Sequence, residues 1–263
     1  MTLSCGDDMA AVLGYANQID DGTVSGGSWN SSYPLANVKT PYLYQKARTS
    51  NTLATSSVII VDCATAQTLG VMALVSHNLT INATVEITAS DYSDFSVLSY
   101  DSGSLNVYAH TDFATSFTPV AARYWKISIS DTGNGDGYIE IGRVFLGWQF
   151  KPGINIDFGV SIGVESDTSS LRALGGPDYF DSRPNRRSWR GTWSWLTEQE
   201  AYAVMVEIMR QQDIEREVYL MEDDEDTSYR AERWFLARFA TLSAIEWPYL
   251  TYHSVGVELT EVI

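Results

Sequence analysis

Cysteine is almost absent from this chain, with only Cys5 and Cys63 among 263 residues. A disulfide-stapled scaffold needs a larger set of paired cysteines, so that class of small secreted protein is excluded. The two thiols could pair with each other, but free thiols are the expectation. Histidine is equally sparse: His77, His110 and His253 show no spacing typical of metal ligands, so no transition-metal site is expected.

Basic residues are scarce too. Lys and Arg total 17 against 33 Asp and Glu, which gives a formal net charge of −16. Such a surface repels phosphates, so we expect no binding to nucleic acid or to anionic membranes. No run reaches the roughly 18 apolar residues that a membrane span needs. The segment 1–14 lacks a basic start and carries Asp7 and Asp8, so it does not read as a signal peptide.

Motifs for catalysis are missing as well. The sequence contains no Gly-x-Ser-x-Gly elbow and no phosphate-binding glycine loop, so we expect a protein without enzymatic activity. Two segments could hold a structural Ca²⁺ through acidic side chains, namely Asp131–Gly137 and Asp20-Asp21-Gly22. The first fails the EF-hand pattern and is better interpreted as a hairpin with Asp136-Gly137 at its turn. No cofactor is therefore expected.

Strand-forming patterns dominate what is present. Aromatics make up 12 % of the residues, including 8 Trp and 15 Tyr, and many short apolar or alternating runs occur before residue 150. Turn residues separate these runs, which is typical of an antiparallel sandwich. In the clearest run, Trp125, Ile127 and Ile129 alternate with polar residues and should face the core. The predicted strands are 58–62, 70–75, 83–88, 95–99, 113–119, 124–130 and 138–148.

One helix stands out, over residues 197–213. Thr197 and Glu200 form a capping box at its start, and an apolar stripe at helical spacing follows. The stripe consists of Ala201, Val204, Met205, Ile208 and Met209. A lone amphipathic helix among strands must lie on a sheet to bury such a stripe.

A boundary at Lys151-Pro152-Gly153 predicts two domains, 1–150 and 151–263. The second should contain strands at 154–165, 189–195, 218–221, 229–241 and 249–261, with a long loop at 172–188. The acidic run 222–226 is interpreted as a hairpin tip.

The first half resembles the discoidin-like, galactose-binding-like jelly roll. Three pieces occur in that family's order: Ala73–Leu79 with its His-Asn-Leu turn, Ala122–Ile127, and Gly137–Gly147. The resemblance covers about residues 15 to 148. It implies a β-sandwich that could contact a host-surface glycan.

The second half resembles minor tail proteins of long-tailed phages, on three features. They are the Trp-rich strand 189–195 before the helix, the strand 218–220, and the closing strand 252–262. The resemblance covers about residues 154 to 263 and implies a β-sandwich with one flanking helix, similar to tail-tube and distal-tail domains. Such domains assemble as rings around the tail lumen.

Two sets of candidate contact residues follow. Arg183, Arg186, Arg187 and Arg190 cluster in an otherwise acidic chain, and the acidic run contains Glu222, Asp223 and Asp224. Because a head-to-tail interface joins two different patches, we predict that these two sets meet between subunits of a ring. Trp29 and Tyr42, in loops of the first half, are predicted to contact glycan.

The resemblances together predict a structural virion protein of a phage tail tip or baseplate, located in the virion and assembled in the bacterial cytoplasm. It would form a ring, expected to be a hexamer, at the distal end of the tail tube. The predicted partners are copies of itself, the tail tube, the tape measure and the hub. A carbohydrate-binding host-adhesion protein is the alternative, and a glycosidase with an accessory module is the third hypothesis.

Overall fold

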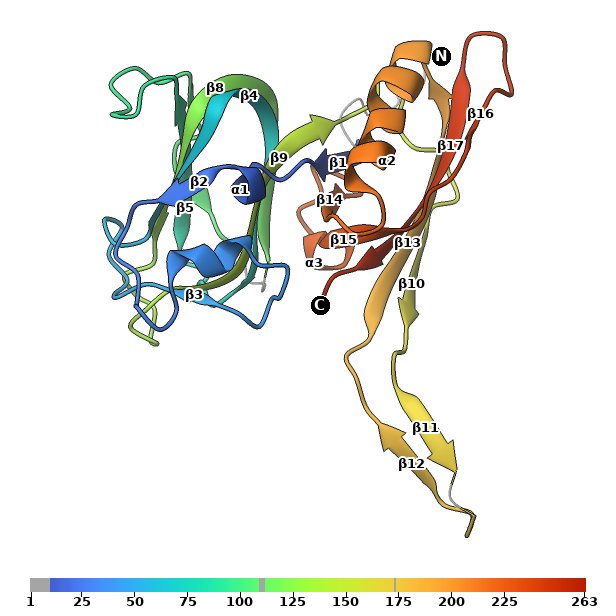
Figure 1. Ribbon diagram of the computed structural model, residues 1–263, viewed down its shortest axis with the longest axis horizontal. Helices are drawn as coiled ribbons and strands as arrows, with labels where there is room; N and C mark the ends of the chain where they lie inside the picture. The colour runs from blue at the N-terminus through green and yellow to red at the C-terminus, as the bar shows by residue number, and fades with distance from the viewer. Residues whose placement is uncertain (1–9, 109–111, 173) are drawn as a thin grey trace.

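One sheet of 15 strands runs through both halves of the chain in the computed structural model, which describes residues 10–108, 112–172 and 174–263 (Figure 1). Its main path is β10-β13-β17-β15-β14-β1-β9-β4-β8-β5-β6. The predicted mainly β class is confirmed. None of the helices in these ranges is long and apolar enough to span a membrane.

The first half is a β-sandwich with its own buried core. Trp125, Ile127 and Ile129 are fully buried in that core, as their alternation predicts. Ile127 pairs with Ile59 on one neighbouring strand and with Ile87 on the other. The strands are β2 (Thr23–Ser25), β3 (Ala47–Arg48), β4 (Val58–His77), β5 (Thr84–Ser90), β6 (Tyr100–Asp101), β7 (Leu105–Asn106), β8 (Phe113–Ser130) and β9 (Glu140–Phe150), with α1 (Gln18–Asp21) and the short 3-10 helix η1 (Leu35–Lys39).

Three predictions for this half need correction. The runs 58–62 and 70–75 belong to one long strand, β4, and the runs 113–119 and 124–130 belong to β8. Bulges in the β4–β8 pairing interrupt the alternation of apolar and polar residues. Each strand therefore continues past the point at which its sequence pattern ends. Residues 95–99 form no strand. The loop 131–137 is not a hairpin, because β8 and β9 lie on either side of β4.

The second half consists of strands with one helix segment across them. The strands are β10 (Ser161–Glu165), β11 (Ser169–Arg172), β12 (Asp178–Asp181), β13 (Arg186–Leu196), β14 (Val218–Met221), β15 (Trp234–Thr241), β16 (Ile245–Glu246) and β17 (His253–Glu261). The helix segment combines η2 (Gln199–Met205), which is wound as a π-helix, with α2 (Val206–Gln212). A one-turn helix, α3 (Arg230–Arg233), occupies the start of the strand expected over 229–241.

The predicted helix is confirmed, including its start. The Thr197 hydroxyl accepts from the Glu200 amide at 3.3 Å, and the Glu200 carboxylate accepts from the Thr197 amide at 2.8 Å. Ala201, Met205 and Ile208 are fully buried in one cluster with apolar and aromatic side chains of β13, β15 and β17. The apolar stripe therefore lies on a sheet, although the first two turns are wider than an α-helix.

The first described strand, β1 (Val12–Tyr15), joins the two halves. It pairs with β9 on one side and with β14 on the other, so the sheet continues across the predicted boundary. A third buried cluster mixes side chains of both halves, among them Val71 and Phe145 with Tyr219 and Leu236. The face of β14 and β15 that points away from the helix therefore packs on β4 and β9.

A buried ion pair crosses the same junction. Arg143 on β9, with a side chain only 3 % exposed, donates to Glu217 at 2.7 Å, and the Glu217 side chain is equally buried. Arg143 also donates to both carboxylate oxygens of Asp20 at 2.7 Å and to the Val38 carbonyl at 3.1 Å. Burial by itself would lower the pKa of Arg143. The carboxylates of Asp20 and Glu217 outweigh this effect, so the pKa of Arg143 lies above its usual value.

A hairpin arm projects from the second half, where a long loop was expected over 172–188. In this arm, residues 161–188, β10 pairs with the start of β13 and β11 pairs with β12. Figure 1 shows the β11–β12 end extending well away from the rest of the molecule. The strand expected over 154–165 begins only at Ser161, and the one expected over 249–261 begins at His253.

Candidate functional site

One hollow lies in the first half of the chain, where β1 ends beside β9. It has a volume of about 440 Å³ and is lined by Tyr15, Ala66, Gln67, Thr68, Pro119, Trp148 and Gln149. We refer to it as the Tyr15–Trp148 pocket. Small-molecule sites usually occupy about 300–1,000 Å³, so this hollow is large enough for a sugar-sized ligand.

An irregularity in the β4–β8 pairing opens this pocket. The register shifts between Asp62 and Gln67, and Ala64 adopts a left-handed conformation with φ of 62°. The Asp62 carboxylate holds the bulge by accepting from the Ala64 amide at 2.8 Å and from the Arg123 guanidinium. Beyond the bulge, a Cβ on Gly70 would lie 2.9 Å from the Gln149 Cβ, so a larger residue would push Gln149 out of place.

The lining combines aromatic rings with uncharged polar groups. Tyr15 and Trp148 meet edge to face, with ring centroids 5.6 Å apart at 81°. Burial raises the pKa of Tyr15, so the phenol stays neutral at physiological pH. Gln67 and Gln149 each offer an amide that both donates and accepts hydrogen bonds. No carboxylate, cysteine, histidine or lysine lines this pocket, so its residues fit binding of a neutral polar ligand better than acid–base or nucleophilic chemistry.

The residues predicted to contact glycan, Trp29 and Tyr42, lie elsewhere. Trp29 is half-buried: its indole donates to the Gly26 carbonyl at 3.0 Å, and its ring packs against the core of the first half. Tyr42 is more than half exposed, with its ring centroid 5.7 Å from that of Tyr44. Contact of these two residues with glycan stays a prediction.

Tyr42 lines a second cleft, between the two halves. This cleft of about 310 Å³ also contains Arg186, Arg238 and the end of β17. The structure therefore places Tyr42, which was predicted to contact glycan, in the same cleft as Arg186, which was predicted to contact a neighbouring subunit. The cleft is lined by charged groups, which distinguishes it from the neutral Tyr15–Trp148 pocket.

All four arginines of the predicted subunit interface have acidic partners in their own chain. Arg183 pairs with Asp181 at 3.0 Å, Arg186 with Asp167 at 2.7 Å and Arg190 with Glu258 at 2.6 Å, while Arg187 pairs with Glu261. These partners satisfy the charges that motivated the predicted contact with a neighbour.

The acidic run is also occupied within the chain. Glu222 is half-buried, which raises its pKa, and Asp223 is buried beside Arg233 at 3.9 Å. Asp224 accepts from Lys151 at 2.7 Å and from the Ala10 amide at 3.3 Å. The run does connect two paired strands, β14 and β15, but it folds against the molecule. Contact between the four arginines and the acidic run of a neighbouring subunit stays a prediction. The opposite charges that suggested it are already paired within the chain.

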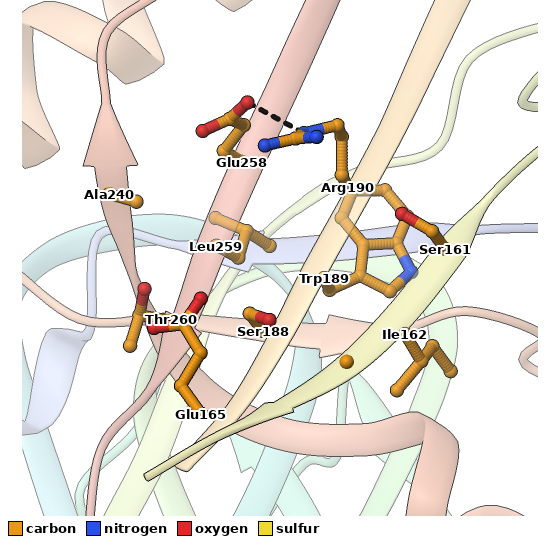
Figure 2. A pocket seen from close by; sticks show the side chains of 11 residues that line it. Ser161, Ile162, Glu165, Ser188, Trp189, Arg190, Ala240, Glu258, Leu259 and Thr260 are labelled. Carbon is orange, nitrogen blue, oxygen red and sulfur yellow. Dashed lines mark ion pairs between the residues drawn. The ribbon is translucent and has the colours of Figure 1, made fainter. Parts of the chain in front are cut away.

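A smaller hollow lies at the root of the arm, on the face of β10, β13 and β17 away from the helix. Figure 2 shows Ser161, Ser188, Ala240 and Thr260 around it, with Arg190 paired to Glu258 at its edge. Its volume of about 180 Å³ is below the usual range for small-molecule sites.

Three of the carboxylates considered for Ca²⁺, those of Asp20, Asp131 and Asp136, accept hydrogen bonds within the chain. Asp20 binds Arg143, and Asp131 accepts from Thr80 and from the Asn134 amide at 3.0 Å. Within the described residues, no group of three or more His, Cys, Asp or Glu side chains is arranged to hold a metal ion. His77 is buried and accepts from the Leu79 amide at 3.1 Å, so its ring fixes a turn. His110 and Cys5 lie outside the described residues.

Comparison with known proteins gives matches among solved structures only. No protein-family model matches the chain, and no curated protein matches it. The family 32 carbohydrate-binding module of NanJ from C. perfringens, solved in complex with galactose, is 16 % identical and has a TM-score of 0.42. It covers 52 % of this chain and 99 % of its own.

Two further structures are similar over the same share of the chain. The lectin-binding domain of lectinolysin, a mutant complexed with Lewis b, is 12 % identical over 51 % of this chain and 96 % of its own, with a TM-score of 0.42. A fucose-binding module of Streptococcus pneumoniae is 12 % identical over 51 % of this chain and 95 % of its own, with a TM-score of 0.40. Each of these structures is similar to about half of this chain, whereas the resemblance to tail proteins stays a prediction.

Proposed function

We propose that this chain is a carbohydrate-binding protein without catalytic activity, and that the Tyr15–Trp148 pocket takes a neutral saccharide. The observation that carries the proposal is the lining of this pocket: two aromatic rings, two glutamine amides and a threonine hydroxyl, with no acid or base. A sugar ring presents a C–H face, which packs on aromatic side chains, and a rim of hydroxyls, which pair with amides.

Charge supports the same choice of ligand. The chain carries a formal charge of −16, so it disfavours the approach of anionic polymers. A neutral saccharide meets no such barrier. The Tyr42 cleft, which is lined by Arg186, Arg238 and Glu261, is the competing location.

A glycan array followed by calorimetric titration of the best neutral hit tests the proposal. Gln67→Ala and Gln149→Ala should each weaken binding about tenfold, since each removes hydrogen bonds made in a partly enclosed site. Gln199→Ala removes an exposed amide from the helix and serves as the matched control, with unchanged affinity expected. If Tyr42→Ala abolishes binding and neither pocket variant alters it, the ligand occupies the other cleft and the assignment is wrong.

A second candidate function is the structural one, a ring component of a phage tail tip that contacts the tail tube and hub. The hairpin arm favours it, because an exposed two-stranded ribbon is only marginally stable alone and is expected to gain a partner in an assembly. The two functions are compatible, since a tail-tip ring could carry a glycan-binding module on its outside. Analytical ultracentrifugation tests the second function, which predicts a concentration-dependent oligomer; a chain that remains monomeric refutes self-assembly.

A further inference from the structure

A wide bulge in β4 forms one side of the Tyr15–Trp148 pocket; we call residues 63–66 the β4 bulge. The pairing of β4 with β8 breaks after Asp62 and resumes at Gln67, so these four residues lie opposite the single residue Arg123. Bulges change the direction of side chains and are over-represented beside functional sites. Gln67 and the last residue of the bulge, Ala66, both line the pocket, so the shape of the bulge determines where this side of the pocket lies.

One ion pair spans the base of the β4 bulge. Arg123 donates through Nε to Oδ1 of Asp62 at 2.8 Å and through Nη2 to Oδ2 at 2.9 Å. This bidentate geometry fixes both the separation and the orientation of the two side chains. The Asp62 carboxylate also accepts from the amide of Ala64, whose φ of 62° is unfavourable for a residue with a Cβ. The pair therefore holds the bulge in a conformation that is unfavourable on its own.

The bulge in turn contacts the pocket through Gln67. The Gln67 side-chain amide donates to the Thr65 hydroxyl at 3.0 Å, and among the described residues this is the one hydrogen bond that its side chain makes. A glutamine side chain has several rotatable bonds and loses its preferred orientation when such a contact is removed. A movement of the bulge should therefore release the Gln67 amide from its place in the pocket lining.

The exposure of the ion pair separates this role from a contribution to the whole fold. The side chains of Asp62 and Arg123 are 32 % and 41 % exposed. Ion pairs as exposed as this one contribute little to the stability of a domain. Loss of the pair should therefore alter the β4 bulge locally and leave the β-sandwich folded.

We propose that Asp62 and Arg123 are positioning residues of the Tyr15–Trp148 pocket, which hold Gln67 where its amide binds a saccharide hydroxyl. This inference rests on the proposed function, since it assigns residues to the same site. Neither of the two charged side chains lines the pocket, so both act through the bulge and not by contact with the ligand. Their contribution to affinity should therefore depend on the Gln67 amide.

A double-mutant cycle measured by calorimetric titration tests this dependence. Arg123→Met should weaken binding of the saccharide selected by the array about three- to fivefold, the most that an exposed ion pair supplies. In a Gln67→Ala background, Arg123→Met should have no further effect. Asp62→Ala should reproduce the loss seen with Arg123→Met, and Arg123→Lys, which keeps the charge, should restore part of the affinity.

Arg48→Met is the matched control. The Arg48–Glu140 pair lies in the same half of the chain, with side chains 26 % and 21 % exposed. Glu140 is eight residues from Trp148 along β9, which is about 26 Å. The control should leave affinity unchanged. Hydrogen exchange gives a readout without ligand: the Ala64 amide should exchange faster in Arg123→Met than in the wild type, and at the wild-type rate in Arg48→Met.

The outcomes separate this inference from the proposed function. Affinity that depends on Gln67 but not on Asp62 or Arg123 overturns the positioning role and leaves the proposed function standing. An equal loss from Arg123→Met with and without the Gln67 amide also overturns the role, because the pair would then act independently of that amide. A wild-type chain that binds no neutral saccharide, or a Gln67→Ala variant that binds as well as the wild type, overturns both.

Discussion

Replacing Arg143 by methionine should destabilise the whole chain, because Arg143 joins its two halves. The substitution keeps an unbranched apolar stem and removes the guanidinium, so it leaves the buried Glu217 carboxylate with Arg238 alone, at 3.4 Å. Removing one partner of a buried ion pair costs about 3–5 kcal/mol. That is a large share of the roughly 5–15 kcal/mol by which a folded domain is stable.

Urea denaturation followed by tryptophan fluorescence and by circular dichroism measures this loss. Arg190→Met is the matched control, because the Arg190–Glu258 pair is exposed and such pairs contribute at most about 1 kcal/mol. A double variant, Arg143→Met with Glu217→Leu, should be more stable than Arg143→Met alone, since it leaves no buried charge without a partner. If Arg143→Met and Arg190→Met lose equal stability, the junction does not depend on this pair and the reasoning is refuted.

Three further predictions concern individual sites. Glu200→Ala should cost about 1 kcal/mol, because it removes the carboxylate that accepts from the Gly153 and Thr197 amides. Burial raises the pKa of Glu200, but these hydrogen bonds lower it overall, so the contribution of the carboxylate is present at neutral pH and is lost in acid as the carboxylate protonates. Denaturation at several pH values measures this loss. Gly147→Ala should lower the midpoint of thermal unfolding, because its Cβ would lie 2.4 Å from the Tyr15 carbonyl oxygen; an unchanged midpoint would contradict the close approach of β1 and β9. Burial raises the pKa of the Cys63 thiol to about 11, so in a Cys5→Ser chain it should react with a thiol reagent at neutral pH only after unfolding.

Local signals predicted local structure well. The Thr197 and Glu200 pair, followed by the apolar stripe, located the helix because both features act within one or two turns. The alternation around Trp125 identified a strand and its buried face for the same reason. The extra width of the first helical turns could not be predicted, since a π-helix leaves the apolar stripe unchanged.

Features that depend on distant residues were missed. The pairing of β1 with β14 joins residues more than two hundred positions apart, and local periodicity carries no information about such a partner. The arm was predicted as a loop because glycine, proline and arginine dominate residues 172–188, while its strands form only by pairing with each other. The Tyr15–Trp148 pocket draws its lining from β1, β4, β8 and β9, so no single motif marks it.

The most direct test of the proposed function is the indole N–H resonance of Trp148 during a titration with the saccharide selected by the array. A Trp148→Phe variant identifies this resonance among those of the 8 tryptophans. If the sugar occupies the pocket, the Trp148 signal shifts progressively and saturates with the same dissociation constant as calorimetry. Saturable binding that leaves Trp148 unchanged and shifts signals of the Tyr42 loop would contradict the account.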